Sequence, residues 1–277
     1  MATTLLSALD RLLEAAQVLS KERKLRKPVQ VAERAIGLAF ERQGREFLKR
    51  LARKRDLFVK EALREATARD LDWEGFWLEV ELATVAVLEE PIAAVHRAAL
   101  EAGIRVAIAD LKAEIAFDLE NPRAVAFLAD RAAERVTMIN ETTREGLRSL
   151  LTKAVDEGWS YGKTAKAIKE QFDGFSGRKP QAHIRSRAHL VAVQEAGEAY
   201  CEGNLQVGKE LQALGLVIDK AWLTTKDSRV SAVCRGNEAQ GWIPIDDAFS
   251  SGHDRPLGHV ACRCSLLTQR RKEAKEV

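Results

Sequence analysis

The sequence predicts a mainly α-helical protein, with long helices in its N-terminal and central parts and a small irregular α+β subdomain at its C-terminus. Only 6 prolines and 17 glycines interrupt 277 residues, and Ala, Leu, Glu, Lys and Arg are the prevalent residue types, as in long helices. Apolar residues recur at helical spacing over most of the chain. After Gly215 the pattern changes to short strand-like segments and a turn-rich region.

Two helices are expected in the first 70 residues. Apolar residues along 3–24 predict an amphipathic helix. Pro28 is expected to separate it from a second helix over residues 31–70, because proline removes a helical hydrogen bond and clashes with the preceding turn. The first helix could pack on its own domain or dock on a partner as a helix in a groove.

The second of these helices is strongly basic. Between residues 41 and 64 there are nine Lys or Arg and four Asp or Glu. The interleaved acids favour a solvated face over contact with DNA, but both interpretations stay open. The pairs spaced for i, i+4 ion pairing are Glu41/Arg45, Glu46/Arg50 and Asp56/Lys60.

Four further helices follow along the chain. Asp72 could cap a helix whose apolar face is Trp73, Phe76, Trp77 and Val80. Pro91 should break or kink this helical pattern, which resumes over residues 92–119. The later segments are a helix from Asn121-Pro122 to about Val155, a short helix over 164–172, and a long helix over 182–214 that Gly215 closes.

Charge and hydropathy indicate a protein made in a cytoplasm. The net charge of +3 is too small to make the whole chain a nucleic-acid binder. Charged residues interrupt the N-terminal apolar positions, so no signal-peptide core is present, and no apolar run approaches the roughly 20 residues that span a bilayer. We therefore expect reduced cysteines and no disulfide framework.

The turn-rich C-terminal region carries a candidate zinc site at Cys234, His259, Cys262 and Cys264. A region of about 45 residues buries little surface, and a structural metal is a common remedy. The spacing His259-x-x-Cys262 lets both side chains reach one ion, and Cys234 would close the loop. Cys264 has the weakest argument from spacing, so His253 stays open as the fourth ligand. The alternative is that the thiols are small buried side chains, as we expect for Cys201.

Several short strings in this region match one family in the same order. They are Trp222-Leu-Thr-Thr-Lys-Asp227-Ser-Arg229-Val-Ser-Ala-Val-Cys234, Ile245-Asp-Asp-Ala-Phe249, and Arg255-Pro256-Leu-Gly-His259-Val-Ala-Cys262-Arg263-Cys264. Together they resemble the C-terminal signature of the phage Mu F-like minor head protein family. Upstream, Arg187-Ala-His-Leu-Val-Ala-Val-Gln194-Glu195 resembles that family's preceding helix, and the resemblance covers roughly residues 122–268.

The chain departs from the family pattern at three positions. Ser231 stands where members often have the first cysteine of a Cys-x-x-Cys pair, which leaves four candidate metal ligands at most. Leu257 replaces the second residue of a Pro-Pro pair, and Gln194 replaces a threonine, so a role for that hydroxyl is in doubt.

The resemblance implies a structural protein of a tailed bacteriophage head with no catalytic role. It implies a virion component present in few copies, associated with the portal or the inner capsid, with the portal, major capsid or scaffolding protein as partners. Contact with packaged DNA is compatible with this role. We accordingly expect a helical region over 1–120 for portal or capsid binding or self-association, a head-morphogenesis domain over 121–268, and a flexible tail over 269–277.

Two other function classes stay open at this point. One is a zinc-dependent hydrolase or effector domain that uses the same Cys/His cluster with Asp227 or Glu195. The other is a DNA-binding module built on the basic helix. A phosphate loop is disfavoured because Gly158 and Gly162 have three residues between them where four are required. The zinc deaminase and His-Glu-x-x-His protease motifs are absent from the sequence.

Overall fold

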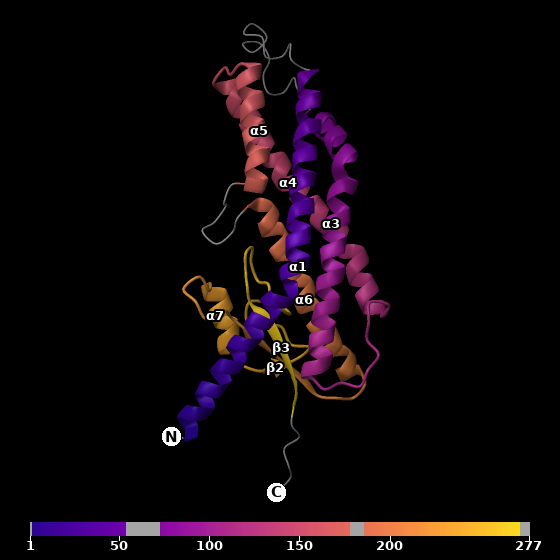
Figure 1. Ribbon diagram of the computed structural model, residues 1–277, viewed down its shortest axis with the longest axis vertical. Helices are drawn as coiled ribbons and strands as arrows, with labels where there is room; N and C mark the ends of the chain where they lie inside the picture. Colours follow the sequence, from indigo (N-terminus) through magenta and orange to yellow (C-terminus); the bar gives the residue numbers. More distant parts are fainter. Residues whose placement is uncertain (1, 54–72, 178–185, 272–277) are drawn as a thin grey trace. The chain divides into compact units, whose positions relative to one another are not determined.

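The computed structural model describes residues 2–53, 73–177 and 186–271 (Figure 1). In this part of the chain the fold is mainly helical with one small sheet, as the sequence predicts. None of the described helices is long and apolar enough to cross a membrane. The elements are α1 (Ala2–Ala52), α3 (Trp73–Asp110), α4 (Pro122–Asp156), α5 (Tyr161–Gly177), α6 (Arg187–Ala213), β1 (Ile218–Leu223), α7 (Ala232–Ala239), β2 (Ile243–Pro244) and β3 (Ser265–Arg270).

The two internal prolines do not end their helices, so the separation expected at Pro28 is wrong, and α3 is not broken at Pro91, where a break or a kink was expected. Pro28 lies within α1 and Pro91 within α3. A proline inside a helix costs roughly 3 kcal/mol, and burial of the surrounding apolar face offsets this cost. Leu25, Val29 and Ala32 are buried around Pro28, and Leu88, Ile92 and Val95 around Pro91.

α3 ends earlier than the expected limit at residue 119. Lys112 adopts a left-handed conformation with φ of 48° just beyond the helix. The Ala113 N–H donates to the Ile108 carbonyl, and the Lys112 N–H donates to Ala109, which is the hydrogen-bond pattern of a Schellman cap. Glycine is the usual residue at such a position, so a lysine there gives no stop signal in the sequence.

The other helix-boundary signals act as expected. The Asn121 side chain accepts a hydrogen bond from the Arg123 N–H, so Asn121 caps α4 with Pro122 as its first residue. Gly215, at φ 92°, closes α6. Trp73, Phe76, Trp77 and Val80 are all buried. The proposed cap at Asp72 lies outside the described residues.

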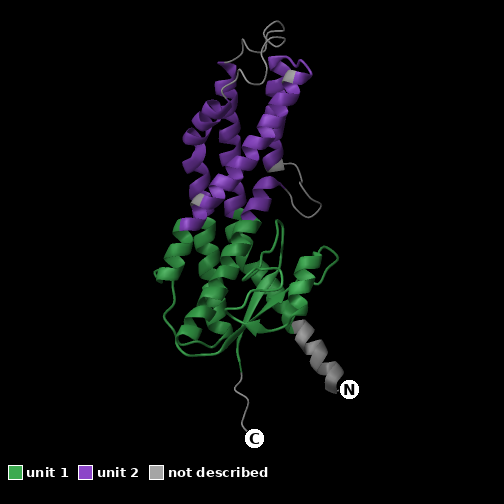
Figure 2. Ribbon diagram, turned by 180° about the vertical axis from the view of Figure 1, so that it is seen from behind, with its two compact units in different colours: residues 1–30, 94–129, 193–277 green, residues 31–93, 130–192 purple. Residues whose placement is uncertain are grey.

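The chain divides into two compact units (Figure 2). Unit 1 contains residues 1–30, 94–129 and 193–277, and unit 2 contains residues 31–93 and 130–192. Both units take chain from either side of residue 120, so the domain division expected there stays a prediction.

Unit 2 is helical and has an aromatic core. Phe47, Trp73, Phe76 and Trp77 form one cluster, with centroid distances of 5.0–6.3 Å between neighbouring rings. The guanidinium of Arg187 lies 4.9 Å from the Phe40 ring and 4.4 Å from the Phe175 ring, and it donates to the Ile139 carbonyl. Burial lowers the pKa of Arg187 to about 10. These contacts give unit 2 a specific, well-packed interior.

Unit 1 contains the sheet and α7. The strand order is β2-β1-β3, and both pairings are antiparallel. β1 is buried along its whole length, and its Ile218 pairs with Arg270. The expected tail over 269–277 therefore starts too early, because Gln269 and Arg270 belong to β3. Residues 272–277 lie outside the described residues.

Candidate metal centre

Three buried thiols meet in unit 1. The Sγ atoms of Cys234, Cys262 and Cys264 lie within 4.8 Å of one another, and each residue is at most 3% exposed. Cys234 lies on α7, and the other two lie in the segment before β3. The Sγ atoms of Cys234 and Cys262 are 3.6 Å apart, well beyond the roughly 2.05 Å of a disulfide. The cysteines are therefore free thiols placed where they could share a ligand.

Local structure explains why Cys234 faces this cluster. The Ser231 side chain accepts a hydrogen bond from the Cys234 N–H and caps α7. Ser231, the position where members of the family often have a cysteine, thus fixes the first turn of the helix that carries Cys234. On the other side, Ala261 has a φ of 63° and the Cys262 N–H donates to the His259 carbonyl, so a tight turn brings these residues together.

His259 lies beside one of the three thiols; among the described residues, the ligand atoms that all lie within 4.8 Å of one another are those of the three cysteines. Its Nε2 lies 3.4 Å from the Cys234 Sγ, and its Nδ1 lies 2.9 Å from the Val260 carbonyl oxygen. A carbonyl oxygen can only accept, so Nδ1 donates this hydrogen bond, and Nε2 is the nitrogen that faces the Cys234 thiol and could bind a metal. Metal-bound histidines commonly carry such a backbone hydrogen bond on their other nitrogen.

The two spacings measured from Cys234 match those of a tetrahedral zinc site. With Zn–S bonds of about 2.3 Å and Zn–N bonds of about 2.0–2.1 Å, tetrahedral ligands lie about 3.8 Å (S–S) and about 3.6 Å (S–N) apart. The corresponding distances from Cys234 are 3.6 Å to Cys262 and 3.4 Å to His259. Three sulfurs and one imidazole also form a donor set that zinc prefers.

Cys264 is one of the three clustered thiols, although its spacing in the sequence gave the weakest support for a metal ligand. Residues two apart in an extended segment lie on the same face. Cys262 and Cys264 are buried, while Arg263 between them is only half-buried. His253, the other candidate, places its Nδ1 2.9 Å from the Ser251 hydroxyl and its ring 6.4 Å from that of Trp222. The geometry therefore favours Cys264 over His253 as the fourth ligand.

Proton sharing and burial shift the thiol pKa values. A hydrogen bond from the Cys264 thiol lowers the pKa of Cys262, and the same interaction raises the pKa of Cys264. Burial raises the pKa of Cys234. Of the three thiols, Cys262 is thus the one whose pKa is lowered.

An ion pair anchors the segment that carries two of the thiols. Both carboxylate oxygens of Asp227 accept from Arg263 Nη2, at 2.7 and 2.6 Å; Oδ1 also accepts from the Arg229 backbone N–H and Oδ2 from the Arg229 side chain. These hydrogen bonds, chiefly the one from Arg263, hold the pKa of Asp227 well below its usual range. Asp227 is therefore an ionised anchor for the Cys262–Cys264 segment.

We predict that Asp227→Asn weakens zinc binding roughly tenfold, because outer contacts that orient ligands typically contribute 10- to 100-fold. Zinc affinity would be measured by competition with a chromophoric chelator at pH 7. The anchor is present above the ordinary aspartate pKa and is lost as the pH falls toward the lowered value. Asp247→Asn, an exposed acid in the same subdomain, is the control. Equal affinities for the two variants would contradict the anchoring role.

Two side chains that the sequence did not single out as contributors also hold the site. Lys21 of α1 is buried and donates to the Cys264 carbonyl. The Gln194 side chain of α6 accepts from the Ala261 N–H at 3.0 Å and donates to Glu198. Gln194 was noticed only as a departure from a family pattern, and nothing in the sequence around Lys21 marks it.

Glu195, the other acid considered for a catalytic role, lies in the interior of unit 1. Its Oε2 is 2.8 Å from His96 Nε2, and the two residues are 3% and 0% exposed. This pair joins α6 to α3. The His96–Glu195 pair is therefore a buried structural contact.

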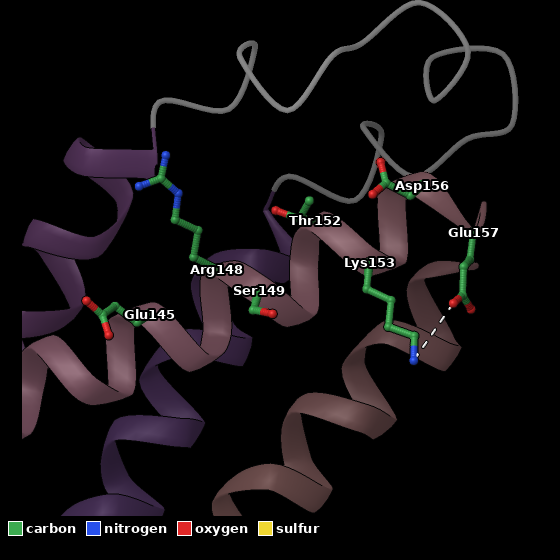
Figure 3. Close-up of a pocket in the computed structure, with 7 residues that line it drawn as sticks. All are labelled: Glu145, Arg148, Ser149, Thr152, Lys153, Asp156 and Glu157. Atoms are coloured by element: carbon green, nitrogen blue, oxygen red, sulfur yellow. Dashed lines mark ion pairs between the residues drawn. The ribbon is translucent and has the colours of Figure 1, made fainter.

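A hollow on α4 offers no second candidate site. Its seven lining residues are all exposed and come from α4 and Glu157 alone (Figure 3). Lys153 and Glu157 form an ion pair at 3.8 Å. Because no second described element contributes a wall, this hollow does not enclose a ligand.

Comparison with known proteins identifies the region around the thiols. Residues 145–267 match the family model described as Phage Mu protein F like protein. This region is a Phage Mu protein F like domain. The match begins within α4, later than residue 122, where the resemblance was expected to start. No curated protein and no solved structure matches the chain.

All four candidate ligands belong to the Phage Mu protein F like domain, together with Asp227, Arg263 and Gln194. The match covers residues 145–267, so the likeness to the phage Mu protein F family is shown for this part of the chain. The candidate ligands thus lie within this domain, whereas Lys21, which donates to the Cys264 carbonyl, lies outside it.

Proposed function

We propose that this protein is a minor structural component of a tailed-phage head, located at the portal or inner capsid, where it aids head assembly or DNA packaging and ejection. The observation that carries the proposal is the Phage Mu protein F like domain over residues 145–267. Its partners would be the portal protein, the major capsid protein or the scaffolding protein.

The physical character of the described residues supports an assembly role. Long helices such as α1, α3 and α4 provide extended surfaces for protein contacts. The C-terminal subdomain gains rigidity from Asn237, which bonds Ser250 and Ser251, and from Glu238, which bonds Thr224. A rigid subdomain of this kind presents a fixed surface to a partner.

We infer that the cluster holds one structural zinc ion through Cys234, His259, Cys262 and Cys264. A structural zinc contributes directly to folding, since a preformed site is absent from the unfolded chain. The zinc would join α7 to the segment before β3, which are far apart in sequence. A hydrolase is less well supported, because Asp227, the base that it would need, is held by two arginines.

Particle composition tests the head role. Proheads and DNA-filled heads would be purified from cells infected with the phage that encodes the protein, and the chain quantified by mass spectrometry against the portal protein. We expect a few copies per particle and co-purification with portal rings. Presence in the lysate but absence from both kinds of particle would overturn the proposal.

A further inference from the structure

One face of α1 in unit 2 carries a row of cations. Positions 34, 42, 45, 49 and 53 are separated by three, four or eight residues, so at 100° per residue they fall within roughly 100° of the helix circumference. We call this row the basic stripe; it consists of Arg34, Arg42, Arg45, Lys49 and Arg53, the last just past the end of α1.

All five side chains of the basic stripe are exposed. The Arg45 and Lys49 side chains are 69% and 64% exposed. The opposite face of α1 is buried through Ile36, Phe40 and Phe47. The stripe is thus the outward face of a helix whose other face is fixed in the core of unit 2.

The neighbouring acids neutralise little of this charge. Glu41 pairs with Arg45 at 3.8 Å, and Glu46 pairs mainly with Arg50 at 2.5 Å. These are two of the three pairs expected from the sequence; the third, Asp56/Lys60, lies outside the described residues. Within the described ranges, Arg34, Arg42 and Arg53 make no ion pair within 4.0 Å. Glu41 and Glu46 lie at the edges of the basic stripe and not within it.

The chemistry of the stripe selects one class of polyanion. It includes no aromatic side chain on which unpaired bases could stack, which disfavours single-stranded nucleic acid. Leu38, 55% exposed, is the one large apolar side chain between Arg34 and Arg53 on this face, so the face lacks the apolar surface that inserts into a membrane. Regularly spaced cations on a straight helix instead suit the phosphates of a DNA duplex.

We propose that the basic stripe binds the phosphate backbone of double-stranded DNA without sequence preference. From Arg34 to Arg53 it extends about 29 Å at 1.5 Å per residue, slightly less than one turn of the duplex. Three to five phosphate contacts give a slope of about −3 to −4.5 in a plot of log binding constant against log salt. The inference does not depend on a place in the phage head, because purified protein suffices to test it.

Binding to a fluorescent random-sequence 30-base-pair duplex would be measured by anisotropy between 50 and 200 mM salt. The test variant is Arg34→Gln/Arg42→Gln/Lys49→Gln. The control variant is Lys153→Gln/Lys166→Gln/Lys169→Gln, which removes the same number of exposed charges from α4 and α5 of the same unit. Both change the formal net charge from +3 to 0. Circular dichroism checks that the helices are retained.

The stripe variant should bind at least about tenfold more weakly at 100 mM salt, and its slope should be smaller by about 2.7. The control should keep the wild-type slope. Three results would overturn the proposal: wild-type protein that does not bind the duplex at 50 mM salt, an equal loss in both variants, or tighter binding to single-stranded DNA. Absence of the protein from phage heads would affect the proposed function and leave this result unchanged.

Discussion

Replacing Cys234 by alanine is expected to remove the zinc ion and loosen the C-terminal subdomain, while the helices of unit 2 stay folded. Cys234 is the residue of the cluster that lies near both His259 and Cys262, at 3.4 and 3.6 Å. The three remaining ligands would bind zinc weakly, and the folding free energy that the ion contributes would be lost. Zinc content should fall from about one per chain to near zero.

Hydrogen exchange measures the structural part of this effect. Backbone amides over residues 218–268 should exchange faster by roughly two orders of magnitude or more, because local opening is no longer opposed by the metal. Amides of α4 and α5 should change little. The matched control is Val233→Ala, since Val233 precedes Cys234 on α7, is 47% exposed and is not part of the thiol cluster. Loss of zinc from both variants, or from neither, would contradict the assignment of Cys234 as a ligand.

Gly103→Ala is expected to destabilise the protein by about 3 kcal/mol or more, since overpacking against backbone atoms leaves little room for adjustment. A Cβ atom at Gly103 would lie 2.1 Å from the Tyr200 carbonyl oxygen. In the reciprocal position, a Cβ at Gly203 would lie 2.5 Å from the Leu100 carbonyl oxygen. α3 and α6 thus approach each other at two glycines, and an added methyl group must push their backbones apart.

Urea unfolding of the full chain gives the free energy of unfolding for this variant. Gly162→Ala is the control, because the added Cβ at this helical position would meet nothing within 4 Å. Alanine there should raise the stability by up to about 1 kcal/mol, the usual gain over glycine in a helix. If Gly103→Ala were as stable as wild type, the close approach of α3 and α6 would be wrong.

Local signals in the sequence predict those parts of the fold that depend on local chemistry. The Asn121-Pro122 pair marks the start of α4, and Gly215 marks the end of α6. Both work through contacts within a few residues. Pro28 and Lys112 gave wrong boundaries for the opposite reason. Tertiary burial around Pro28 and Pro91 outweighs a local preference, and the left-handed turn at Lys112 uses a residue type that seldom adopts it.

In the candidate site, too, local sequence predicts some contacts, and others depend on tertiary packing. Spacing alone brought His259 and Cys262 together, because one tight turn joins them. That Cys234 lies beside them depends on α7 packing against this turn, and the sequence suggested it only through the chemistry of the Cys/His ligand set. Lys21 is separated from Cys264 by most of the chain. A contact of that kind leaves no pattern in one sequence, so only the structure reveals it.

X-ray absorption at the zinc edge, on untagged protein purified without added metal, shows whether Cys234, His259, Cys262 and Cys264 bind a zinc ion. We predict about one zinc per chain, with three sulfurs near 2.3 Å and one nitrogen near 2.0 Å. Protein that is folded but contains no zinc, or zinc surrounded mainly by oxygen, would contradict this prediction.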